Sequence, residues 1–120
     1  MANILLAEDD QSMRDFLTLA LTKAGHDVTA RENGLEALQE LKNNQSYDLL
    51  LTDIVMPGMD GIELSQRATN TYPGLKVMFI TGFAAVAMGS KDIQTDTKVL
   101  SKPFHLKDLV GQVNSLLDAA

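Results

Sequence analysis

The chain has 120 residues, of which 45% are hydrophobic and 22% charged; this composition is typical of a globular protein, and the length suits a single domain over residues 1–120. Sixteen acidic against ten basic side chains give a net charge of −6, which argues against a nucleic-acid-binding protein, because such a protein needs a basic face to replace phosphate counterions. Cysteine is absent, which excludes disulfides and thiolate metal sites.

Short apolar runs alternate with segments of helical periodicity along the whole chain. Residues 3–7 form the first run, and apolar residues then recur every three or four positions from Met13 to Leu21 until Gly25, which suits a C-terminal cap. Residues 27–31 read as a weaker strand, and a second helical pattern begins at Gly34. This alternation predicts parallel strands with helices between them.

The second half of the chain repeats this alternation. Apolar runs cover residues 49–52, 77–80 and 99–100, and helical patterns begin near Ile62 and Leu106. A further, mostly apolar segment over residues 83–88 could begin a fourth helix before Gly89 interrupts it. We therefore expect an α/β fold with five strand-like runs in a parallel sheet and helices on both of its faces.

Chemically reactive side chains follow four of the apolar runs. Glu8, Asp9 and Asp10 follow the first run, Asp53 the third, Thr81 the fourth and Lys102 the fifth. Ligands of open parallel sheets bind at the carboxyl ends of the strands, so we expect these groups to meet in one crevice. Taken singly, each has an ordinary structural explanation as a turn former, a helix-terminal charge or a solvated loop residue.

The expected crevice has the chemistry of a phosphoryl acceptor. Clustered carboxylates repel one another and need a compensating cation, and an oxygen-only ligand set suits Mg²⁺ better than zinc. A carboxylate can act as the nucleophile, while a metal ion, a lysine and a hydroxyl neutralise and bind the transferred oxygens.

These residues carry a resemblance to a known family. Residues 4–10, the segment Asp53-Ile54-Val55-Met56-Pro57-Gly58-Met59-Asp60-Gly61, the pair Thr81-Gly82 and residues 102–104 resemble the receiver domain of two-component response regulators over essentially the whole chain. The resemblance implies a doubly wound five-stranded parallel sheet in the order 2-1-3-4-5, flanked by five helices.

The family's functional residues can be assigned one by one by this resemblance. Asp53 matches the phosphoacceptor, which takes its phosphoryl group from a phosphohistidine of a histidine kinase or histidine phosphotransferase. Glu8 and Asp9 match the acidic pair, and together with Asp53 and the backbone carbonyl of Val55 they would hold Mg²⁺. Thr81 matches the switch hydroxyl and Lys102 the phosphoryl-binding lysine. Such a domain is a signalling protein whose only chemistry is its own phosphorylation and dephosphorylation.

The sequence departs from the family pattern at several positions. Val99 replaces the aromatic residue that many receivers carry three positions before the lysine, so the usual coupling of that residue to the threonine is not expected. Val55 and Phe83, two positions after Asp53 and Thr81, are both apolar and cannot orient a hydrolytic water. This predicts a long-lived phosphoaspartate. We also expect the segment over residues 83–88 to be either a buried helix or a docking surface.

The chain ends just after the last predicted helix, so we expect a stand-alone receiver without an output domain. Its residues 7–10, 51–57, 79–87 and 98–106 are most similar to alphaproteobacterial single-domain receivers that act as adaptors in cell-cycle proteolysis. By that resemblance, the unphosphorylated form engages the ClpX unfoldase and primes degradation by ClpXP, and a phosphorelay switches it off. A phosphorelay shuttle or a motility switch is the alternative.

A flavodoxin-like electron carrier is a more distant alternative with the same topology. It would need a glycine- and hydroxyl-rich phosphate loop after the first strand, where this chain has three acidic residues. No apolar run approaches the length of a membrane span, and residues 1–3 lack a basic leader. We therefore expect a cytoplasmic protein that does not insert into membranes.

Overall fold

The computed structural model describes residues 2–44, 46–82 and 98–118. Strands and helices alternate along these segments, as the sequence predicts. In chain order they are β1 (Asn3–Ala7), α1 (Gln11–Lys23), β2 (Asp27–Arg31), α2 (Gly34–Asn43), β3 (Leu49–Asp53), α3 (Gly61–Thr71), β4 (Lys76–Thr81), β5 (Lys98–Ser101) and α5 (Leu106–Asp118).

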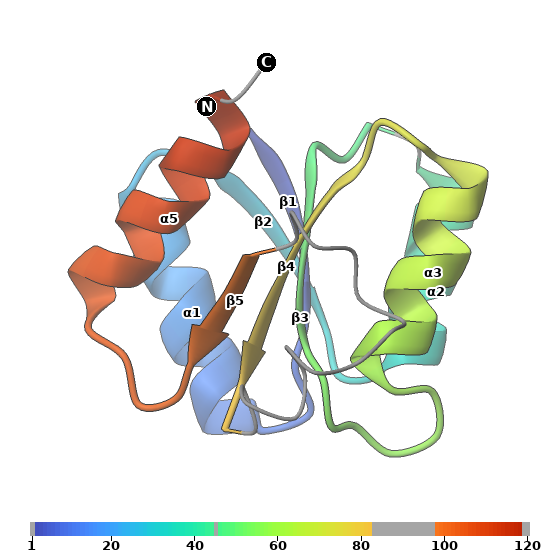
Figure 1. Ribbon diagram of the computed structural model, residues 1–120, viewed down its shortest axis with the longest axis horizontal. Helices are drawn as coiled ribbons and strands as arrows, with labels where there is room; N and C mark the ends of the chain where they lie inside the picture. Colours follow the sequence, from blue (N-terminus) through green and yellow to red (C-terminus); the bar gives the residue numbers. More distant parts are fainter. Residues whose placement is uncertain (1, 45, 83–97, 119–120) are drawn as a thin grey trace.

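The five strands form one parallel sheet in the order β2-β1-β3-β4-β5, which confirms the predicted topology. Four helices flank the sheet within the described residues, α1 and α5 on one face and α2 and α3 on the other (Figure 1). The expected fourth helix, over residues 83–88, lies outside the described part of the chain. No helix in the described residues is long and apolar enough to cross a bilayer.

The central strands are buried because both faces of the sheet are covered. Every residue of β3 is buried, and so are the last four residues of β1, as expected of strands that helices cover on both sides. One core, with Leu17, Leu21, Leu109 and Val113, lies under α1 and α5, and a second, with Leu41 and Leu64, lies under α2 and α3. β2 lies at the sheet edge and is only partly buried, which explains its weaker pattern.

Local signals in the sequence explain where several helices begin and end. The side chains of Asn33 and Asp60 accept hydrogen bonds from backbone N–H groups in the first turns of α2 and α3, which is the ordinary N-cap interaction. Gly25, just beyond the end of α1, has φ +100°, the left-handed conformation that glycine adopts readily at helix ends.

Two large apolar residues that belong to the helical patterns of the sequence are exposed. Phe16 on α1 is 47% exposed and Leu35 on α2 is 66% exposed. The inward positions of α1 are taken by Leu17, Ala20 and Leu21, and those of α2 by Ala37, Leu38 and Leu41.

Candidate functional site

The register of the sheet brings the predicted site residues together at the carboxyl end of the strands. Ala7 pairs with Thr52, so Glu8 and Asp53, each the next residue along its chain, leave β1 and β3 at the same level. Thr81 pairs with Ser101 at the ends of β4 and β5, and Lys102 follows directly. All of these residues therefore lie at the carboxyl end of the sheet, where open parallel sheets bind ligands.

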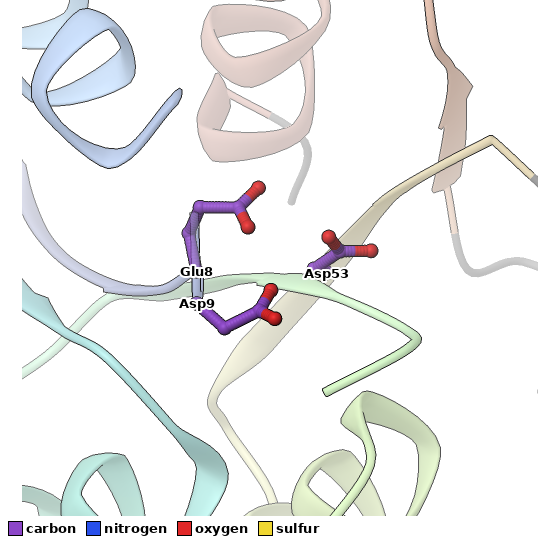
Figure 2. Close-up of side chains that lie close together, drawn as sticks. All are labelled: Glu8, Asp9 and Asp53. Atoms are coloured by element: carbon purple, nitrogen blue, oxygen red, sulfur yellow. The ribbon is translucent and has the colours of Figure 1, made fainter. Parts of the chain in front are cut away.

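Three carboxylates converge at this end of the sheet. One carboxylate oxygen from each of Glu8, Asp9 and Asp53 lies within 4.8 Å of the other two, and Figure 2 shows the three side chains directed toward a common space. Glu8 and Asp53 are buried, whereas Asp9 is exposed. The site is thus built into the protein on one side and reachable from solvent on the other.

Lys102 links the two buried acids of this cluster. Its Nζ donates to Oδ2 of Asp53 at 2.9 Å and to Oε1 of Glu8 at 3.2 Å. The lysine is itself held in place, because its backbone N–H donates to the carbonyl oxygen of Thr81 at 2.9 Å. The second carboxylate oxygen of Asp53, Oδ1, accepts a hydrogen bond from the backbone N–H of Ile54 at 2.8 Å.

Burial and neighbouring charges shift the pKa values of Glu8 and Lys102. Burial and, to a smaller extent, the charge of Asp53 raise the pKa of Glu8 to about 7. The hydrogen bond from the Asp10 backbone N–H and the charge of Lys102 act in the opposite direction and lower this pKa. Burial by itself would lower the pKa of Lys102, but its hydrogen bond to Asp53 and the two acidic charges outweigh burial and raise it. The lysine stays charged, and the pocket still carries an excess of negative charge.

This donor set fits a hard divalent cation. All three side chains offer oxygen, and one carboxylate oxygen from each lies close enough to the others to share one ion. The structure therefore brings together Glu8, Asp9, Asp53 and Lys102, as predicted from the sequence.

The remaining residues named from the sequence lie around this cluster. Thr81 is fully buried at the end of β4. Val55 is two residues past Asp53, and its side chain is 57% exposed. Asp10, to which no metal role was assigned, is the N-cap residue of α1, and its backbone N–H donates to Oε2 of Glu8. Phe83 lies outside the described residues.

Sequence reasoning missed one residue that contacts the acidic loop. Arg14 on α1 donates from Nη1 to the backbone carbonyl of Glu8 at 2.8 Å. No spacing rule could have found it, because the acceptor is a main-chain atom whose position depends on how the loop after β1 is folded.

Comparison with known proteins agrees with this geometry. The family model described as "Response regulator receiver domain" matches residues 4–114. The chain is 59% identical over 121 residues to the "Response regulator receiver protein CpdR" of Brucella abortus, with complete coverage of both chains. It is 34% identical to the sensor kinase CckA of the same organism, of whose length it spans only 13%.

Solved structures show the same fold. The response regulator TrrA of Thermotoga maritima, crystallised with Mg²⁺ and a beryllium fluoride, superposes with a TM-score of 0.88 at 27% identity, covering 97% of this chain and 99% of TrrA. TrrA in complex with the histidine kinase ThkA also gives a TM-score of 0.88 at 27% identity, with coverage of 98% and 100%.

Proposed function

This chain belongs to the response regulator receiver family, and we propose that it is a stand-alone receiver in which Asp53 accepts a phosphoryl group in a Mg²⁺-dependent reaction. The observation that supports this proposal most strongly is the meeting of three carboxylates within 4.8 Å beside a lysine that donates to Asp53 at 2.9 Å. A histidine kinase or histidine phosphotransferase is the donor expected for this family.

In the proposed reaction, a carboxylate oxygen of Asp53 attacks the phosphorus of a phosphohistidine. An O–P bond forms to Asp53, the N–P bond breaks, and the imidazole nitrogen keeps the electron pair of that bond. Glu8, Asp9, Asp53 and the backbone carbonyl of Val55 would hold Mg²⁺, which supplies charge neutralisation for the phosphoryl oxygens when it is bound.

The other residues of the site act on the same oxygens. The hydrogen bond to Asp53 and the neighbouring acidic charges raise the pKa of Lys102, so the side chain stays protonated. Its Nζ donates to Oδ2 of Asp53 at 2.9 Å. In the phosphorylated protein its ammonium is expected to move from the carboxylate to a phosphoryl oxygen. The hydroxyl of Thr81, at the end of β4, would bind another phosphoryl oxygen and so report phosphorylation to the neighbouring backbone.

Phosphorylation would then control a partner. We propose that the unphosphorylated chain engages the ClpX unfoldase and primes proteolysis by ClpXP, and that phosphorylation of Asp53 weakens this contact. Two observations support this proposal: the resemblance of the sequence to single-domain adaptors, and the 59% identity to CpdR over the full length of both chains. A receiver that only passes phosphoryl groups along a relay, or that switches motility, would share the chemistry and differ in its partner.

One experiment tests both levels of the proposal. Binding to the ClpX N-terminal domain is measured by calorimetry for the wild-type protein and Asp53→Asn, each with and without Mg²⁺ plus beryllofluoride, which mimics a phosphoryl group. We expect both unphosphorylated proteins to bind, and the mimic to abolish binding of the wild type alone. Binding in neither state, with beryllofluoride shown by ¹⁹F NMR to occupy the wild-type site, would contradict the adaptor role and leave the receiver chemistry standing.

A further inference from the structure

In the loop that carries Glu8 and Asp9, every polar atom of Glu8 takes part in a hydrogen bond. Its backbone N–H donates to the carbonyl of Arg31 at the end of β2, at 3.1 Å. Its carboxylate accepts from the backbone N–H of Asp10 and from Lys102. The remaining atom, the backbone carbonyl oxygen, accepts from Nη1 of Arg14 at 2.8 Å.

Arg14 provides the contact that ties this loop to α1 through a side chain. The N-cap residue, Asp10, makes no side-chain capping bond, and α1 has no acidic residue in its first turn. The guanidinium group therefore adds a side-chain anchor to the turn between β1 and α1, at the carbonyl just before Asp9. A planar guanidinium fixes direction as well as distance, because its donors lie in one rigid plane.

The position of Arg14 is not explained by helix stability. It lies one turn into α1 and is only partly buried, and a cation near a helix N-terminus opposes the helix dipole. A residue that breaks a local rule of this kind often does so for function. Here the compensation is the hydrogen bond to the carbonyl of Glu8.

We propose that Arg14 is a positioning residue of the metal site. By holding the carbonyl of Glu8, it fixes the turn from which the carboxylates of Glu8 and Asp9 reach toward Asp53. Outer groups that orient metal ligands commonly change metal affinity 10- to 100-fold when they are removed. This inference rests on the proposed function, because it requires that the three carboxylates bind a divalent cation.

The sign of the effect separates positioning from charge. Removing a cation that is bonded to the backbone of Glu8 would, by Coulomb's law alone, favour the binding of Mg²⁺. Losing the anchor of the turn would weaken it, because the carboxylates must then be gathered when the ion binds. Arg14→Ala is therefore expected to bind Mg²⁺ at least about 10-fold more weakly than the wild type.

The experiment measures Mg²⁺ affinity by calorimetry together with the rise in Tm that saturating Mg²⁺ gives over EDTA. Arg14→Met, which keeps the aliphatic stem without any donor, is measured beside Arg14→Ala. A variant is used for the comparison only if it unfolds cooperatively in EDTA, and the second variant guards against misfolding of the first. Arg14→Lys, which keeps a charge and a donor, is expected to recover most of the affinity. Arg67→Ala is the matched control, because Arg67 is also a helical arginine but forms its ion pair with Glu63, on an exposed part of α3.

The expected pattern is weaker binding and a smaller Mg²⁺-induced rise in Tm for the alanine and methionine variants, with Arg67→Ala within twofold of the wild type. Affinity of the Arg14 variants equal to or tighter than that of the wild type would overturn the positioning role and leave the proposed function intact. Absence of saturable Mg²⁺ binding by the wild-type protein would instead contradict the proposed function itself.

Discussion

Gly61, the first residue of α3, lies against the backbone of the proposed phosphoacceptor. A Cβ atom added to Gly61 would be 2.0 Å from the carbonyl oxygen of Asp53 and 3.0 Å from Cα of Ile54. The same region carries two hydrogen bonds, from Gly61 N–H to the carbonyl of Ile54 and from the hydroxyl of Thr52 to the carbonyl of Asp53, both 2.8 Å long. Gly61→Ala must therefore move main chain rather than a flexible side chain.

The expected cost follows from what has to move. Inserting a methyl group into a packed site costs about 1–3 kcal/mol, and a clash with backbone on this scale belongs at the upper end. Restricting the unfolded chain returns roughly 0.4–1 kcal/mol, so Gly61→Ala should lose about 2–3 kcal/mol. For a chain of this length, with an unfolding entropy of about 0.25 kcal/mol/K, that lowers Tm by about 8–12 °C.

Gly111, inside α5, provides a matched control for the same chemical change. Apart from Gly111 itself, its two chain neighbours and the backbone of its own helix, no heavy atom of the described residues lies within 4 Å of the position that its Cβ would take. Alanine is preferred over glycine in a helix by about 0.5–1 kcal/mol. Gly111→Ala should therefore raise Tm by about 2–4 °C. Both variants are followed by thermal unfolding in EDTA. A Tm of Gly61→Ala within about 2 °C of the wild type would refute the packing explanation.

Three further substitutions have expected outcomes. Lys102→Met removes the cation bonded to Glu8 and Asp53 and should cost about 1–3 kcal/mol in EDTA; Mg²⁺ should raise its Tm more than that of the wild type, and an unchanged Tm in EDTA would contradict the importance of the ion pair. Val55→Asn places an amide at an exposed position beside the site and should shorten the lifetime of the phosphorylated protein several-fold, measured by loss of radiolabel; an unchanged lifetime would sink the idea that an apolar residue there protects the phosphoaspartate. Lys76→Met removes the hydrogen bond from Nζ to the carbonyl of Leu116, 2.7 Å long, at the C-terminal end of α5; it should cost about 1 kcal/mol and speed amide exchange in the last turn of α5, and equal exchange in both proteins would argue against this cap.

The fold was predictable because the sequence repeats two strong signals. Buried parallel strands require apolar runs, and the polar residue that follows a run marks the carboxyl end of that strand. The same signal located most of the site, since Glu8 and Asp53 follow directly on such runs and Lys102 comes one residue later. The order of the strands came from the family resemblance, because hydrophobic pattern alone does not say which strands are neighbours.

The differences between expectation and structure have physical causes. An apolar side chain in a helical pattern is buried only if another element packs over it, and nothing in the periodicity distinguished Phe16 from its neighbour Leu17, although their exposures are 47% and 0%. Arg14 was missed for a related reason. Its acceptor is a carbonyl oxygen, which every residue has, so only the folded loop identifies the one that it binds.

The contacts of Lys102 also bear on when the site first exists during folding. Its hydrogen bonds to Glu8 and Asp53 join residues 94 and 49 positions apart in the chain, and the lysine emerges from the strand that comes last in sequence. Contacts of such long range form only after most of the chain is ordered. A ribosome-bound or truncated chain that stops before β5 would carry the acidic residues without their lysine. The lysine is therefore expected to join the acidic cluster in a single step, when β5 docks beside β4.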